Sequence, residues 1–187
     1  QIGRGALIDP RKKDDQSDND RIIDEIVQCM TDLSRRRVGL LIVFEQHTGL
    51  KDVIETGTAV DARISAPLLE NIFEPNTPLH DGAVVVRGPR VVAAACILTL
   101  TEGRGISREL GTRHRAAIGI SETTDAVVLI VSEETGIMSM AKGGKLTRHL
   151  DAKSLREILE GMYQGESRSK LLSALSSLKR GKEAGNK

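Results

Sequence analysis

Val38-Gly39-Leu40-Leu41-Ile42-Val43-Phe44 is a short and continuous apolar run within the first quarter of the chain. Such a run is typical of a strand that is buried on both faces of a sheet. A second run of this kind lies at Ala126–Val131 (AVVLIV). Because a strand that is apolar on both faces needs cover on both, the two runs predict a central sheet with helices on each side.

Segments with helical periodicity lie around these runs. Residues 20–35 carry an apolar face at helical spacing, made of Ile22, Ile23, Ile26, Val27, Met30 and Leu33. A short helix is expected at Ser65–Phe73, because Ser65 is a favoured cap and Pro67 is tolerated in a first turn. Two more helices are expected, from Gly111 or Thr112 onwards and from Asp151 or Ser154 to about Tyr163.

Glycine-containing turns between β-branched runs predict hairpins. Ala83–Val86 and Val91–Leu98 flank an Arg-Gly-Pro-Arg turn, and Gly136–Ala141 is expected to pair with the Ala126–Val131 strand. Hairpins make neighbouring strands antiparallel, so the sheet is expected to be mixed. The predicted fold class is α/β, with a central, mixed and mostly buried sheet flanked by helices on both sides.

The two ends of the chain are expected to lie outside one domain at residues 21–164. Residues 1–20 are expected to be irregular, because Asp9–Asp20 mixes charges of both signs and is typical of a solvated loop. Residues 165–187 are expected to form an amphipathic helix that ends in a basic tail.

The composition of the 187 residues narrows the function classes. Aromatic residues make up 2%, and 27 basic residues nearly balance 26 acidic ones. A nucleic-acid surface needs stacking side chains or a basic field, so no nucleic-acid partner is expected. Cys29 and Cys96 lie inside apolar runs and are expected to be buried thiols. No apolar run approaches the roughly 18 residues that span a bilayer, so this chain alone is expected to be soluble.

The first candidate cluster for chemistry is Leu79-His80-Asp81-Gly82-Ala83, which follows a proline-containing loop and precedes a strand. Asp81 could accept a proton, and His80 could offer a ring nitrogen to a metal ion. Gly82 would let a ligand approach the backbone closely. A plain turn, whose aspartate binds nearby amides, is the alternative.

The second cluster is Gly111-Thr112-Arg113-His114-Arg115-Ala116-Ala117, at an expected helix start. The first N–H groups of a helix lack internal partners and attract anions. Arg113 and Arg115 could grip phosphate oxygens in bidentate fashion. The alternative is a basic helix start that faces solvent.

The third cluster is Ser132-Glu133-Glu134-Thr135-Gly136, directly after a buried strand. A carboxylate there could complete a divalent-cation site with a histidine and phosphate oxygens, although paired acids also occur in ordinary turns. Together the three clusters supply the groups that nucleotidyl or phosphoryl transfer needs. His47 and His149 have no suggestive neighbours and are expected to be surface residues or satisfied core residues.

At these residues the sequence resembles the diadenylate cyclase (DAC) domain family, over about Arg21 to Leu150. The motifs that carry the resemblance are His80-Asp81-Gly82-Ala83, Leu110-Gly111-Thr112-Arg113-His114-Arg115-Ala116-Ala117, Gly119-Ile120-Ser121-Glu122 and Val131-Ser132-Glu133-Glu134-Thr135-Gly136. One departure is Thr99, which stands where the family usually has proline.

The resemblance implies an ATP-binding cleft lined by these motifs. Asp81 would lie beside the ribose 3′-hydroxyl and activate it, with Arg113 and Arg115 as the other catalytic residues. A divalent Mn²⁺, Mg²⁺ or Co²⁺ ion would be bound by His80 and Glu134. The remaining contacts to the nucleotide would come from Gly82, Ala83, Leu98 and Ser132, and those to its phosphates from Gly111, Thr112, Arg113, His114 and Arg115.

The resemblance also implies the reaction. Two ATP molecules would be condensed into cyclic di-AMP and two pyrophosphates across a symmetric homodimer. The opening Gln1-Ile2-Gly3-Arg4 resembles the segment that follows the membrane helices in the membrane-anchored, CdaA-type branch. The full-length protein would then lie at the cytoplasmic face of the cell membrane, with a membrane-bound regulator as a further candidate partner. A catalytically silent domain that binds adenine nucleotides, and a plain interaction domain, are the alternatives.

Overall fold

The computed structural model describes residues 10–103, 110–163 and 165, with residues 10–16 described by their backbone alone. Its centre is a seven-stranded sheet in the order β2-β4-β3-β1-β5-β6-β7. The strands are β1 (Leu40–Phe44), β2 (Thr58–Arg63), β3 (Ala83–Arg87), β4 (Arg90–Cys96), β5 (Val127–Val131), β6 (Met138–Lys142) and β7 (Lys145–Leu150). The helices are α1 (Pro10–Arg36), α2 (Lys51–Ile54), α3 (Ala66–Phe73), α4 (Thr112–Thr123) and a final helix at residues 152–163.

The sheet is mixed, as expected. Strand β1 lies in the middle and pairs in parallel with β3, whereas every other pairing is antiparallel. Both predicted hairpins, β3–β4 and β5–β6, are present.

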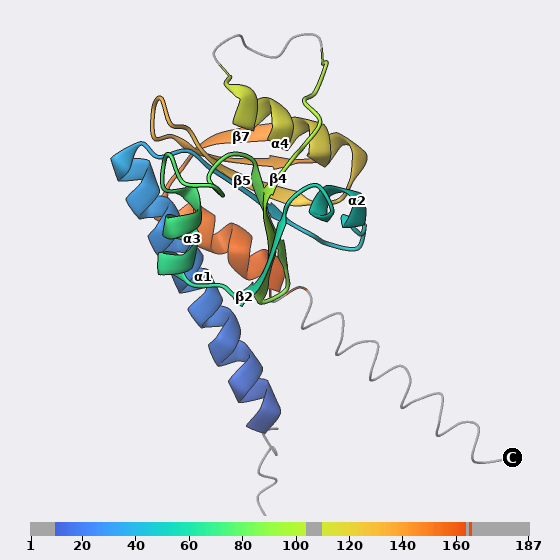
Figure 1. Cartoon of the computed structure of the whole chain (residues 1–187). Coiled ribbons are helices and arrows are strands. Elements are labelled where there is room, and N and C mark those ends of the chain that lie inside the picture. Colours follow the sequence, from blue (N-terminus) through green and yellow to red (C-terminus); the bar gives the residue numbers. More distant parts are fainter. Residues whose placement is uncertain (1–9, 104–109, 164, 166–187) are drawn as a thin grey trace, which may run out of the picture.

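Helices cover both faces of the sheet (Figure 1). Leu40, Ile42 and Phe44 of β1 point into a core shared with α1, α3 and the final helix. Leu41 and Val43 point into the other core, shared with α4 and the start of α2. The α/β prediction is therefore confirmed, and β1 is the buried centre of both layers.

Helix α1 supplies much of the first core. Its inward side chains, at most 1% exposed, are those of Ile22, Ile23, Ile26, Cys29, Met30 and Leu33. Burial of each large aliphatic side chain is worth roughly 1.5–3 kcal/mol. The two thiols are buried as predicted, and burial raises the pKa of Cys96 to about 11.

The expected helix starts are confirmed where a capping group was identified. The Oγ of Ser65 accepts a hydrogen bond from the N–H of Leu68 at 3.4 Å. The carboxylate of Asp151 accepts one from the N–H of Ser154 at 2.8 Å. Gly111 is the residue before α4.

The expectation of an irregular segment at residues 10–20 is wrong, because α1 begins at Pro10 and not at residue 20. Proline is favoured at the first position of a helix, and no glycine or second proline interrupts the sequence as far as Arg36. Mixed charges also suit the solvent-facing side of a helix, where Asp18 and Arg21 form a pair at 3.9 Å. Residues 1–9 and the predicted helix and tail at 166–187 lie outside the described residues.

Candidate active site at one edge of the sheet

Strand register brings the first and third clusters to the same edge of the sheet. Strands β1 and β3 run parallel, with Ile42 beside Val84, so both begin at this edge. Strand β5 runs the other way and ends there, with Val131 beside Leu40. The His80–Ala83 cluster, which leads into β3, and the Ser132–Gly136 turn, which leaves β5, therefore flank the start of β1. We call this the site edge.

Arg113 connects the second cluster to the site edge. Its Nη1 donates a hydrogen bond to the carboxylate of Glu133 at 2.6 Å, and its guanidinium lies against Gly39, directly before β1. The side chain is 18% exposed. The three clusters, remote in sequence, thus meet around the first residues of β1.

His80 is held in one defined tautomer. Its Nδ1 lies 2.7 Å from the carbonyl oxygen of Thr77. Because a carbonyl can only accept, Nδ1 must carry the proton, and Nε2 of the neutral ring keeps its lone pair. A histidine whose other nitrogen donates to a backbone carbonyl is the usual arrangement of a metal ligand. Asp81 beside it is exposed.

Gly82 is required by the backbone. Its φ is +107°, and a Cβ at this position would lie 2.7 Å from the carbonyl oxygen of Cys96. The close approach that glycine allows is therefore that of strand β4, where the β3–β4 register shifts. The expected approach of a ligand at Gly82 stays a prediction. Ala83 is fully buried, so only its backbone could line a ligand.

The start of α4 presents polar groups to solvent. Gly111 provides no side-chain cap for the first N–H groups of the helix, and Thr112 and Arg115 are exposed. The Nη2 of Arg115 donates to the carbonyl oxygen of Thr101 at 3.3 Å. The N–H groups of a helix start, together with a guanidinium beside them, favour anions.

His114 lies beneath this surface. Its ring is buried, with 5% of the residue exposed, and its Nε2 has no hydrogen-bond partner among the described residues. Burial, and then the positive charge of Arg148, lowers the pKa of His114, while the charge of Glu134 acts in the opposite direction. The ring is therefore neutral at neutral pH. A direct phosphate contact would require it to leave this position, so its placement favours support of the helix start.

The Ser132–Gly136 turn is anchored to the end of α1. The hydroxyl of Ser34 donates to the carbonyl oxygen of Gly136 at 2.6 Å. Gly136 has a φ of +76°, and a Cβ there would collide with the carbonyl oxygen of Ser34. The Oγ of Ser132 accepts from the N–H of Thr135 at 3.3 Å, which closes the turn. Glu133 and Glu134 are exposed on it.

The loop that follows β4 packs on α4 through Leu98 of the loop and through Gly119 and Glu122 of the helix. Leu98 is partly buried against the α4-side core. The N–H of Thr101 donates to the carbonyl oxygen of Arg115 at 3.1 Å, and its hydroxyl donates to Glu122 at 3.0 Å. A Cβ on Gly119 would collide with the backbone of Thr99. These residues hold α4 against the loop.

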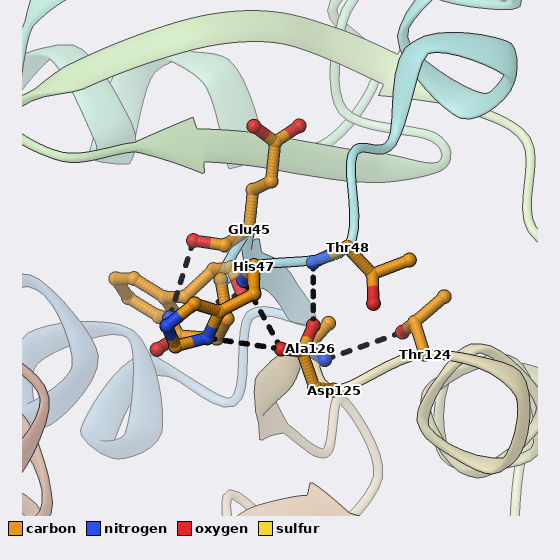
Figure 2. A network of polar contacts seen from close by, with 8 residues as sticks. Glu45, His47, Thr48, Thr124, Asp125 and Ala126 are labelled. Atoms are coloured by element: carbon orange, nitrogen blue, oxygen red, sulfur yellow. Dashed lines mark hydrogen bonds and ion pairs between the residues drawn. The ribbon is translucent and has the colours of Figure 1, made fainter.

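A cavity of about 720 Å³ lies at the opposite end of the sheet, between the end of β1 and the final helix. None of the predicted site residues lines it. Its polar rim includes Asp125, whose carboxylate accepts from the N–H groups of His47 and Thr48 at 3.0 Å each (Figure 2). These bonds lower the pKa of Asp125, the bond to Thr48 most. The side chain of His47 is 95% exposed, as expected of a residue outside the site.

The described part of the chain contains no group of three His, Cys, Asp or Glu side chains ready to hold a metal ion. A two-ligand site at His80 and Glu134 would draw its other ligands from phosphate oxygens and water, as magnesium sites commonly do. In the same part of the chain, no helix has the length and apolar character needed to cross a membrane.

Comparison with known proteins gives one family. Residues 27–146 match the model of the DAC family, described as DisA bacterial checkpoint controller nucleotide-binding. The chain is 46% identical over 168 residues to the cyclic di-AMP synthase CdaA of Bacillus subtilis, covering 90% of this chain and 62% of that protein. It is 45% identical over 158 residues to a diadenylate cyclase of Listeria monocytogenes, covering 84% and 58%.

A solved structure agrees with this assignment. A double mutant of DacA from Staphylococcus aureus superposes with a TM-score of 0.77 at 47% identity, over 79% of this chain and 98% of that one. The chain spans about 60% of the length of the curated relatives above. Both the matched residues and the fold show that the chain belongs to the DAC family of nucleotide-binding domains.

Proposed function

We propose that the chain is a diadenylate cyclase domain, which condenses two ATP molecules into cyclic di-AMP and two pyrophosphates. The observation that carries the proposal is the meeting of the three clusters around the start of β1, with Arg113 between Gly39 and Glu133. The names of the B. subtilis and L. monocytogenes relatives support it.

In the proposed reaction, the 3′-oxygen of one ATP attacks the α-phosphorus of the other. A bond forms between these atoms, the bond from the α-phosphorus to the bridging oxygen breaks, and pyrophosphate leaves. Asp81, exposed at the site edge, accepts the proton of the 3′-hydroxyl. A second, symmetric attack closes the ring.

The remaining predicted residues would bind the substrate. The uncapped start of α4 and the guanidinium groups of Arg113 and Arg115 would hold the phosphates, while His114 supports them from below. Gly82, Ala83 and Ser132 would line the nucleotide, and Leu98 would pack on adenine.

His80 and Glu134 would hold the divalent cation, for which Mn²⁺, Mg²⁺ and Co²⁺ are the candidates. The defined tautomer of His80 suits this role, because its Nε2 lone pair is available. The bound ion would neutralise charge on the phosphates. We further propose that the full-length protein is anchored at the cytoplasmic face of the membrane, where a membrane-bound regulator could reach it. A similar Bacillus cereus chain (50% identity, TM-score 0.66, over 68% of this chain and 63% of that one) is described as a hypothetical membrane-spanning protein.

Product analysis tests the proposed activity. Incubation of the chain with ATP and Mn²⁺ is expected to yield cyclic di-AMP and two pyrophosphates per molecule, measured by chromatography and a pyrophosphate assay. A protein that binds ATP without consuming it would instead be the catalytically silent regulatory domain. A protein that does not bind ATP would be the plain interaction domain.

A second prediction concerns assembly. Two ATP molecules must face each other for mutual attack, and a two-fold dimer presents the same surface from both partners. The rate per protomer is therefore expected to fall on dilution, in step with the dimer fraction measured by light scattering or mass photometry. A constant rate per protomer in a fully monomeric sample would contradict a requirement for the homodimer.

A further inference from the structure

Gly39 lies directly against the guanidinium of Arg113. It is buried directly before β1, and a Cβ built on it would lie 2.6 Å from both Cζ and Nη1 of Arg113 and 3.0 Å from its Nε. These distances are far below ordinary van der Waals contact. The guanidinium thus occupies the space that any side chain at position 39 would need.

One described polar contact, to Glu133, holds the guanidinium in this position. Nη1 donates to Glu133 at 2.6 Å, while Nε is buried and has no hydrogen-bond partner among the described residues. Glu133 stands on the turn that Ser34 fixes to α1. The position of Arg113 is therefore set by the backbone of Gly39 and by the carboxylate of Glu133.

The backbone does not explain why position 39 is glycine. The described glycines with positive φ are those at 82, 88, 136, 143 and 144, so Gly39 has a conformation open to alanine. The atoms that a Cβ would meet are the far end of a flexible side chain, which can move aside. A methyl group at this position would thus displace the guanidinium and leave the strand in place.

We propose that Gly39 is a positioning residue for the reaction: by lacking a side chain, it lets the Arg113 guanidinium lie over the start of β1, where it meets the triphosphate. This inference rests on the proposed function, because it assumes that Arg113 binds phosphate. It adds to the site a residue that carries no functional group of its own.

The test uses Gly39→Ala in the 187-residue chain, with Gly49→Ala as the matched control. Gly49 is exposed near the other end of β1, has no positive φ, and a Cβ there would meet nothing within 4 Å. Displacement of a catalytic group by about 1 Å can cost roughly 100-fold in rate. We therefore expect kcat/KM for ATP to fall about 100-fold in Gly39→Ala, with a Tm close to that of the parent, and to stay unchanged in Gly49→Ala.

A double-mutant cycle separates positioning from general damage. If Gly39 acts through Arg113, adding Gly39→Ala to Arg113→Ala changes kcat/KM by less than about twofold. Should Gly39→Ala lower the Tm, Arg113→Ala restores it, because the new methyl group then meets no guanidinium. Independent, multiplying losses of activity, an unrestored Tm, or full activity of Gly39→Ala would each overturn the inference.

Binding of 3′-deoxy-ATP, which lacks the attacking hydroxyl, distinguishes the two proposals. If the parent chain makes no cyclic di-AMP, the proposed function fails, and Gly39 is still tested through the affinity for this analogue. Weaker binding by Gly39→Ala than by the parent supports the inference, provided that the double variant binds the analogue as well as Arg113→Ala alone does. Equal binding by the parent and Gly39→Ala overturns it.

Discussion

The Asp81→Asn variant is expected to lose cyclic di-AMP synthesis by roughly 100- to 10,000-fold, the range that a positioned general base contributes. Asparagine keeps the shape of the side chain but cannot accept the proton of the 3′-hydroxyl. Asp81 is exposed, so the substitution should leave the Tm and the affinity for 3′-deoxy-ATP nearly unchanged.

Initial rates at saturating ATP and Mn²⁺ measure the effect of Asp81→Asn. Asp52→Asn is the matched control, because Asp52 is an exposed aspartate of α2, outside the site edge. Full activity in Asp81→Asn would refute its role as the base. Equal losses in both variants would show that the loss is not specific to Asp81 and would indicate a disturbed fold.

Loss of the cation is the second large effect. A chelator is expected to stop synthesis, and added Mn²⁺ to restore it. His80→Ala should raise the half-activating Mn²⁺ concentration by at least roughly 10- to 100-fold, because even indirect partners of a metal ligand affect affinity that much. Because Nδ1 of His80 is hydrogen-bonded to Thr77, Nε2 is the ligand atom that His80→Ala would remove from the ion.

The control for His80→Ala is His47→Ala, whose side chain is 95% exposed at the other end of the sheet. Activity is measured across a Mn²⁺ titration at fixed ATP, together with Mn²⁺ binding in the presence of 3′-deoxy-ATP. An unchanged Mn²⁺ dependence in His80→Ala would remove His80 from the cation site, whatever its effect on the maximal rate.

The buried elements could be predicted from the sequence, and the exposed ones could not. Strands β1 and β5 are apolar on both faces, which leaves them few alternatives. The edge strands β2 and β7 consist of exposed residues such as Asp61 and partly buried residues such as Arg148, so their apolar signal is weak. They are held by backbone pairing with β4 and β6, which local composition does not encode.

The candidate site divides in a similar way. The residues that bear functional groups form recognisable local clusters, whereas Gly39 and Ser34 have no such neighbours in sequence. Their contributions arise from contacts with Arg113 and Gly136, far along the chain. The burial of His114 likewise follows from the packing of α4 on the sheet, and only the face of the helix on which it lies could have indicated it.

The hydrogen bond from Ser34 to Gly136 connects the end of α1 to the candidate site. Helix α1 has 27 residues, so it is a rod of about 40 Å. Figure 1 shows its N-terminal half extending beyond the sheet. The last turn of α1 is hydrogen-bonded to the loop that carries Glu133 and Glu134. The helix whose buried face builds the first core therefore also supports this loop, so a substitution that shifts the packing of α1 is expected to shift the two carboxylates as well.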